Sequence, residues 1–181
     1  MTSSSNCFFL ISLVVSLLFF LESTLSMAST KDVIDSICND SFLRHNKTFC
    51  VETLTAYPPV VSATNTVKLV KAAVDLGMIH AKKTASFVAG LEKEPTFKKY
   101  FKMCNESYIS IVGNFRSARL ELDDSESIDT ASSDILVSLD NTQMVKDTIG
   151  KNTDKASKRL IEMTLVMEEF IAIGFGAVNQ I

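Results

Sequence analysis

One thiol and two imidazoles are the side chains of this sequence best suited to nucleophilic or acid–base chemistry: Cys104, His45 and His80. His45 lies in a polar stretch between two cysteines, and His80 lies among lysines within a run of helical periodicity. The chain has no His-Glu-x-x-His, Cys-x-x-Cys, phosphate-binding or Gly-rich dinucleotide motif. We therefore interpret both imidazoles as surface or partly packed side chains, and we predict no catalytic residue, no cofactor and no enzyme activity.

Charged side chains give no clearer sign of a site. The densest acidic cluster comprises Glu121, Asp123, Asp124, Glu126 and Asp129. Its spacing does not match the twelve-residue calcium loop, which needs a central glycine and a closing glutamate. We interpret the cluster as a solvated turn between helices and predict no metal site. Lys82 and Lys83 could mark a surface for an anionic partner, but adjacent lysines are typical of the solvent-exposed face of a helix.

The N-terminal segment indicates where the chain goes. Residues from Phe8 to Leu21 form an almost unbroken apolar run, and small residues follow up to Ala28. About 14 apolar residues fall short of the roughly 20 that a membrane-spanning helix needs. We therefore predict a secretory signal peptide, residues 1–28, that is removed from the mature protein.

The mature chain fits one domain. Removing 28 of the 181 residues leaves 153, with 18 basic and 20 acidic side chains because Glu22 is lost. This charge gives no basic footprint for nucleic acid, and no further stretch could cross a membrane. Cys38, Cys50 and Cys104 remain, so in an oxidising compartment two cysteines should pair and one is left over.

Hydrophobic periodicity predicts four amphipathic helices. The first spans residues 64–91 and the second 96–122, where a strict alternation of four- and three-residue steps includes Cys104. The third spans residues 131–149, and the fourth follows the break at "IGKNTDK". Their expected buried seams are Val67, Val70, Val74, Met78, Ala81, Ala85 and Val88; Phe97, Phe101, Cys104, Tyr108, Ile111, Phe115, Ala118 and Leu122; Ile135, Leu136, Leu139, Val145 and Ile149; and Ala156, Leu160, Met163, Met167, Phe170 and Gly174.

Two further short helices are expected ahead of these, joined by a loop between Cys38 and Cys50. Helices this short are unstable alone in water, and a disulfide closing the 13-residue loop would stabilise them by about 3 kcal/mol. The predicted fold is therefore all-α: an antiparallel up-down four-helix bundle, residues 61–181, preceded by a short disulfide-linked helical hairpin, residues 29–60.

Three sequons would be N-glycosylation sites in a secreted chain: Asn39, Asn46 and Asn105. Asn46 is the best candidate because it lies in a polar loop and its sequon ends in threonine. Asn39 directly follows a cysteine that we expect to be bridged, and Asn105 follows a seam residue on a helix.

The combination of a signal peptide, the segment "ICNDSFLRHNKTFCVETL" and then a bundle with "KKYFKMCNESY" in its second helix resembles the plant invertase and pectin methylesterase inhibitor family. The resemblance covers essentially the whole mature chain, residues 29–181. Its most specific parts are the spacing of Cys38 and Cys50 followed by Leu54, and the Cys-x-x-x-Tyr at Cys104 and Tyr108. The sequence is most similar to invertase inhibitors of the plane-tree pollen-allergen type.

The resemblance also gives Cys104 an interpretation. Members of this family normally carry a fourth cysteine that bridges the second and third bundle helices, and alignment on Leu139 puts Val145 at that position. Cys104 then resembles half of a lost bridge, a free thiol that packs as a small hydrophobe facing Val145. The alternative is a reactive redox thiol, which would need an exposed, electropositive setting such as the nearby Lys98, Lys99 and Lys102 could supply.

The resemblance implies a secreted apoplastic or cell-wall protein, rather than a vacuolar one, that occludes the active cleft of an acid invertase or a pectin methylesterase in a 1:1 complex. The invertase-directed members carry a Pro-Lys-Phe motif before their fourth cysteine, and "DDSESIDTASSD" lacks it here. Pro95, Thr96 and Phe97 are only loosely similar to that motif and lie in another connection. Two alternatives stay open: a structural or allergen-type secreted bundle without an enzyme target, and a carrier of a small apolar ligand.

Overall fold

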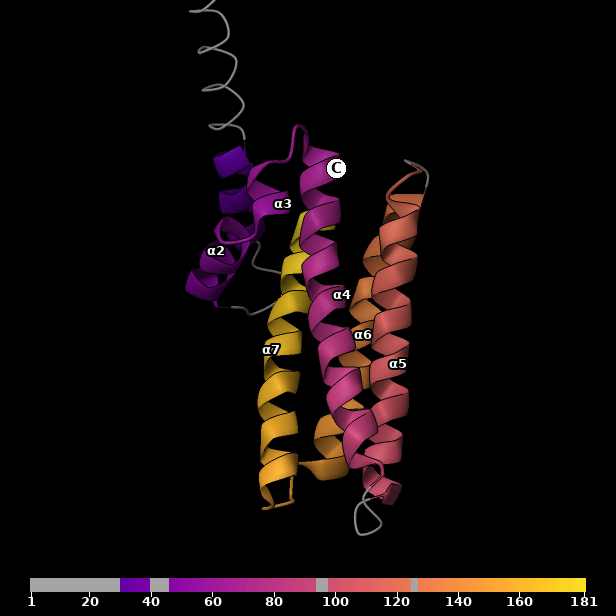
Figure 1. Cartoon of the computed structure of the whole chain (residues 1–181). Helices are drawn as coiled ribbons and strands as arrows, with labels where there is room; N and C mark the ends of the chain where they lie inside the picture. Colours follow the sequence, from indigo (N-terminus) through magenta and orange to yellow (C-terminus); the bar gives the residue numbers. More distant parts are fainter. Residues whose placement is uncertain (1–29, 40–45, 94–97, 125–126) are drawn as a thin grey trace, which may run out of the picture.

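The computed structural model describes residues 30–39, 46–93, 98–124 and 127–181, and within these ranges the chain is helical and contains no strand. Residues 30–39 are helical. The following helices, labelled as in Figure 1, are α2 (Lys47–Thr55), α3 (Pro58–Val61), α4 (Thr66–Leu91), α5 (Lys98–Glu121), α6 (Ile128–Ile149) and α7 (Lys155–Val178). Helices α4 to α7 form an antiparallel up-down bundle, and residues 30–39 and 46–61 lie against one end of it, beside α4 and α7 (Figure 1). The predicted fold class is confirmed.

Polar side chains cap the start of three of these helices. Asn46 accepts a hydrogen bond from the backbone N–H of Phe49 (3.1 Å), and Asn65 and Asp154 cap α4 and α7 in the same way, each at 2.9 Å. Such caps satisfy N–H groups that have no partner inside the helix. The short α3 was not predicted; it begins at Pro58, because proline is tolerated where a helix needs no N–H donor.

The seam of α5 is buried as predicted. Phe101, Cys104, Tyr108, Ile111, Phe115, Ala118 and Leu122 are all buried, whereas Phe97 lies outside the described residues. In α4 one seam residue was assigned wrongly, because Val67 is 38% exposed and Leu69 and Ala73 are buried instead. Leu69 faces the hairpin, so the first turns of α4 bury a second face that a single-seam pattern does not include.

Helices α6 and α7 depart from the apolar pattern in opposite ways. In α6 the hydroxyl residues Ser138 and Thr142 are fully buried, while Leu136 and Leu139 are only partly buried. In α7 every residue from Phe170 to Val178 is buried. A helix that is buried on all sides must be covered by more than its two bundle neighbours, and here the hairpin supplies the extra cover.

Candidate functional site

The hairpin is closed by a disulfide between Cys38 and Cys50, whose Cα atoms lie 5.6 Å apart. The bridge joins the helical residues 30–39 to α2, and Ile37 and Leu54 are fully buried next to it in sequence. The disulfide and these apolar side chains belong to the same hydrophobic core as the bundle helices.

The hairpin contacts α7 at one polar and one aromatic point. The backbone N–H of Asn46 donates a hydrogen bond to Glu169 Oε2 (2.7 Å). The ring of Phe49 packs edge-on against Phe170, with centroids 5.6 Å apart, and the imidazole of His80 on α4 also lies against Phe170, at 5.1 Å. Phe170 thus connects the hairpin with the bundle interior.

The setting of His80 in this cluster favours the neutral imidazole. Its Nε2 lies 2.9 Å from the carbonyl oxygen of Met163, so the Nε2–H donates to α7. Burial lowers the pKa of His80, the hydrogen bond to Met163 opposes this, and the positive charge of Lys83 lowers the pKa further. No carboxylate or nucleophile is hydrogen-bonded to the ring in the described part of the chain, so the imidazole has a packing role and not a catalytic one.

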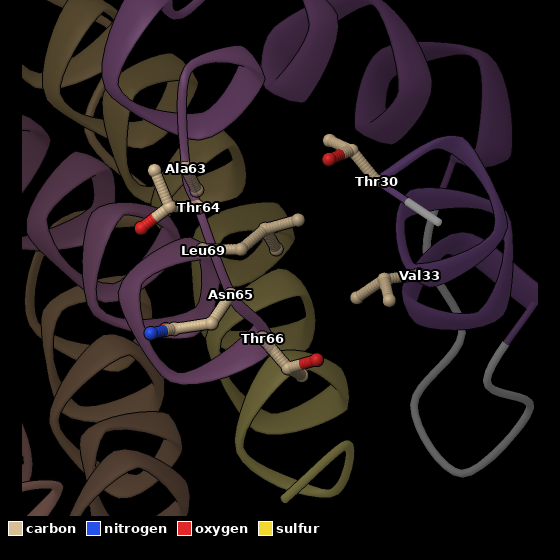
Figure 2. Close-up of a pocket in the computed structure, with 7 residues that line it drawn as sticks. All are labelled: Thr30, Val33, Ala63, Thr64, Asn65, Thr66 and Leu69. Carbon is tan, nitrogen blue, oxygen red and sulfur yellow. The ribbon is translucent and has the colours of Figure 1, made fainter. Parts of the chain in front are cut away.

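Two depressions flank the hairpin. The first, about 280 Å³, lies between the helical residues 30–39 and the start of α4; its lining is shown in Figure 2 and consists of Thr30, Val33, Ala63, Thr64, Asn65, Thr66 and Leu69. The second, about 240 Å³, includes Ile34, Val51 and the half-exposed Val61. Hydroxyls and apolar groups dominate the first lining, which contains no titratable side chain to drive a reaction.

Cys104 has no chemistry of its own in this setting. Its side chain is fully buried and free, and burial raises its pKa to about 12, so the thiol stays protonated at physiological pH. One turn further along α5, the Tyr108 hydroxyl lies 2.9 Å from Thr164 Oγ1 on α7, and burial raises the pKa of this phenol as well. Both groups are structural.

Val145 is fully buried on α6, the neighbour of α5. Met103, which precedes Cys104, lines one depression together with Met144, which precedes Val145. The antiparallel register therefore brings Cys104 and Val145 to similar heights in the bundle. Their direct opposition remains a prediction, for which a test is given below.

The acidic turn is held by ion pairs. Asp123 pairs with Lys71 of α4, and this contact lowers the pKa of Asp123; nearby, Arg119 Nε lies 3.3 Å from an oxygen of Asp75. No group of three or more potential metal ligands occurs within the described residues. Glu126 lies outside them, as do His45, Pro95, Thr96 and Phe97.

A second surface, on α5 and α6, combines exposed apolar and acidic side chains. Met103 is 43% exposed and Met144 51% exposed. They line a shallow depression of about 430 Å³, here called the methionine groove, with Asp140, Gln143, Asp147 and Thr148. Flexible thioethers that face solvent are typical of adaptable protein-binding surfaces. The sequence analysis did not predict this groove because it considered only the buried seams. The feature that indicates it is an apolar residue outside the seam on each of two neighbouring helices, Met103 on α5 and Met144 on α6.

The sequons differ in their surroundings. Asn46 is exposed and uses only its Oδ1 and backbone N–H in the contacts described above. Asn39 is exposed but accepts a hydrogen bond from Lys47 Nζ and donates one to Asp35. Asn105 is half-buried and donates from Nδ2, the atom that would carry a glycan, to Glu92 (3.0 Å).

The exposed pair Lys82 and Lys83 lies on the solvent side of α4. Among the described residues, no helix is both long and apolar enough to span a bilayer.

A model of the plant invertase/pectin methylesterase inhibitor family matches residues 32–168. The chain belongs to this family. Its members are inhibitors of pectin methylesterase or invertase and not enzymes, which agrees with the absence of a catalytic motif from the sequence.

Two solved structures share the fold. The crystal structure of mutant form A of a pectin methylesterase inhibitor from Arabidopsis has a TM-score of 0.67 and 18% identity, covering 82% of this chain and 96% of that one. A crystal structure of a pectin methylesterase inhibitor from Arabidopsis thaliana has a TM-score of 0.56 and 19% identity, covering 81% and 93%. No curated protein matches the chain. At these identities the likeness establishes the fold and not the target.

Proposed function

We propose that the mature chain, residues 29–181, is secreted into the plant cell wall and inhibits a pectin methylesterase or an acid invertase there. It does so as a protein plug that covers the active cleft of the enzyme in a 1:1 complex. The observation that carries this proposal is the family match over residues 32–168, which spans the hairpin and nearly all of the bundle.

The methionine groove is the surface we propose for contact with the enzyme. The opposite side of the bundle is covered at one end by the hairpin, which packs on α7 and precedes α4. The groove offers two adaptable apolar side chains, Met103 and Met144, and the exposed carboxylates of Asp140 and Asp147 beside them. Such a surface suits a partner with an apolar anchor and a neighbouring cation.

The proposed glycan position agrees with this orientation. Asn46 is exposed at the start of α2, next to α7, so a glycan there would project away from the α5–α6 side. We propose that Asn46 is the sequon in use and that Asn105 is not, because its Nδ2 is bonded to Glu92. Intact mass after secretion from plant cells, before and after enzymatic deglycosylation, tests this with Asn46→Gln and Asn105→Gln variants.

The deciding experiment titrates pectin methylesterase and acid invertase in parallel with the mature protein at mildly acidic pH. We expect stoichiometric inhibition of one of them at micromolar protein or below. Met103→Glu with Met144→Glu should weaken inhibition about tenfold or more, because charge replaces the apolar anchor. The matched control, Ile79→Glu with Leu165→Glu, changes two equally exposed apolar residues on α4 and α7 and should leave inhibition unchanged. No inhibition of either enzyme would leave the fold intact and remove the proposed function.

A further inference from the structure

The cysteine sulfurs of the described residues are poorly placed to meet an oxidant. Cys38 and Cys50 are joined in the buried disulfide, and Cys104 is a fully buried thiol whose pKa burial raises to about 12. A thiol reacts with oxidants as its thiolate, so Cys104 is protected both by burial and by its proton. Any oxidation of sulfur under mild conditions must therefore begin at a methionine.

The methionines of the described residues differ in their access to solvent. Met163 and Met167 are buried on α7, and Met78 on α4 is partly buried against the core. Met103 and Met144 are the two exposed ones among the described residues, and although they come from different helices, both line the methionine groove. An oxidant in solution therefore meets two thioethers in one depression.

We propose that Met103 and Met144 form a paired oxidation site for hydrogen peroxide, and that oxidation of the pair weakens binding of the target enzyme. In each step the sulfur donates an electron pair to one peroxide oxygen, the O–O bond breaks, and the second oxygen leaves as water. The sulfur is oxidised to a sulfoxide and the peroxide is reduced. The weakening rests on the proposed function, which makes the groove the contact with the enzyme, whereas the oxidation does not.

A sulfoxide would turn the apolar anchor of the groove into a hydrogen-bond acceptor with few donors around it. When ionised, Asp140 and Asp147 only accept hydrogen bonds. The Thr148 hydroxyl already donates to the backbone carbonyl of Met144 (2.7 Å), and Gln143 Nε2 donates to Asp147 (2.8 Å). Water would therefore solvate the new oxygens. An enzyme that covers them must remove this water, and burying a polar group without a hydrogen bond is unfavourable.

Oxidation and enzyme binding should exclude each other. In the complex the enzyme covers the groove, so peroxide reaches the two thioethers only in the free inhibitor. The change is reversible, because methionine sulfoxide reductases convert a sulfoxide back to a thioether. Neither side chain belongs to the buried core, so the bundle stays folded in both states. The pair would thus let an oxidant lower the amount of active free inhibitor.

The first measurement needs no enzyme. The mature protein is treated with hydrogen peroxide at mildly acidic pH, and its peptides are mapped by mass spectrometry at successive times. Met103 and Met144 should gain one oxygen each about tenfold faster than the buried Met163 and Met167. Equal rates for the exposed and the buried methionines, or oxidation of Met78 as fast as that of the pair, would overturn the oxidation site.

The second measurement compares inhibition before and after the same treatment, with the peroxide destroyed by catalase before the enzyme is added. The wild type and the control Met78→Leu should each inhibit about tenfold more weakly after treatment. Met103→Leu with Met144→Leu should change by less than about twofold from its own untreated value, because leucine has no sulfur to oxidise. The two single variants should show intermediate losses, and reduction by methionine sulfoxide reductases should restore the treated wild type.

Two results would remove the regulatory role and leave the proposed function intact: an equal loss in the wild type and the double leucine variant, or selective oxidation of the pair with unchanged inhibition. A different result would remove the proposed function, namely inhibition of neither enzyme by the untreated wild type. The regulatory role falls with it in that case, and the peptide map alone decides whether Met103 and Met144 are the oxidation site.

Discussion

Cys104 is free because Cys38 and Cys50 pair with each other, and its burial makes that state harmless. A thiol with a pKa of about 12 has almost no thiolate at pH 7, and a fully buried sulfur is out of reach of oxidants. The protein can therefore carry this free cysteine without forming intermolecular bridges. The same burial makes the side chain usable for a designed bond, provided that the neighbouring helix offers a suitable position.

Val145→Cys tests whether that position is the one inferred from sequence. If Val145 faces Cys104, the two cysteines should form a bridge that closes a 42-residue loop, worth about 4 kcal/mol in the chain-entropy model before any strain. The oxidised variant should then lose its titratable thiol and melt several degrees above its reduced form. Thiol titration and thermal unfolding under both conditions provide the measurement. If both thiols stay free after oxidation, and the variant melts at the same temperature under oxidising and reducing conditions, the helices have another register.

Helix α4 approaches α5 closely at Gly77. A Cβ built there would lie within 2.9 Å of three ring atoms of Phe115, so the position accepts no side chain unless the ring moves. Gly113 on α5 is the opposite case, because nothing lies within 4 Å of a Cβ at that position. One glycine is thus required by packing, and the other is not.

The two glycines should therefore respond to alanine with opposite signs. Gly77→Ala should lower the free energy of unfolding by about 1–3 kcal/mol through overpacking. Gly113→Ala should raise it by up to about 1 kcal/mol, because alanine is the better helix former and nothing obstructs it. Urea unfolding of both variants beside the wild type measures the difference. A stable Gly77→Ala protein would mean that Phe115 can rotate away at little cost.

At the level of single helices, the sequence predicted the buried residues correctly where those residues are also apolar. The seam of α5 is made of large apolar residues at strict spacing, so its buried face could be predicted residue by residue. In α6, Ser138 and Thr142 occupy seam positions without being apolar, and Thr142 is satisfied by Leu139 and by Glu168 of α7. The sequence alone does not identify those partners, because they depend on how the helices pack. The burial of Leu69 could not be predicted for the same reason, since it depends on where the hairpin docks.

Acid responses of the whole molecule depend on which groups change charge between the folded and unfolded states. The pKa of His80 is lowered in the folded protein, so its contribution to stability is present above the unfolded pKa of 6.5 and is lost as pH falls through the folded pKa. Asp123 and Asp154 also have lowered pKa values, and their contributions persist until the pH falls below about 3.8. Of these three groups, His80 is the one whose contribution changes between these two ranges.

His80→Gln should accordingly flatten the dependence of stability on pH. Glutamine keeps an N–H that can reach the Met163 carbonyl but does not titrate. The wild type should lose free energy of unfolding as the pH falls below 6.5, and the variant should lose less down to about pH 4. Denaturant unfolding at several pH values in this range measures both curves, with His80→Phe as a second variant that lacks the donor. Parallel curves for wild type and His80→Gln would exclude His80 as the source.

The hairpin is synthesised before all the bundle helices, and α7, one of the two helices it packs against, is synthesised last. As the chain is synthesised, residues 30–61 emerge before any bundle helix, and their disulfide joins cysteines only 12 positions apart. Two of the groups that hold the hairpin in place, Glu169 and Phe170, belong to the final helix. The contacts of the hairpin with α7 can therefore form only after more than a hundred further residues have been synthesised, whereas those with α4 involve the segment that follows the hairpin directly.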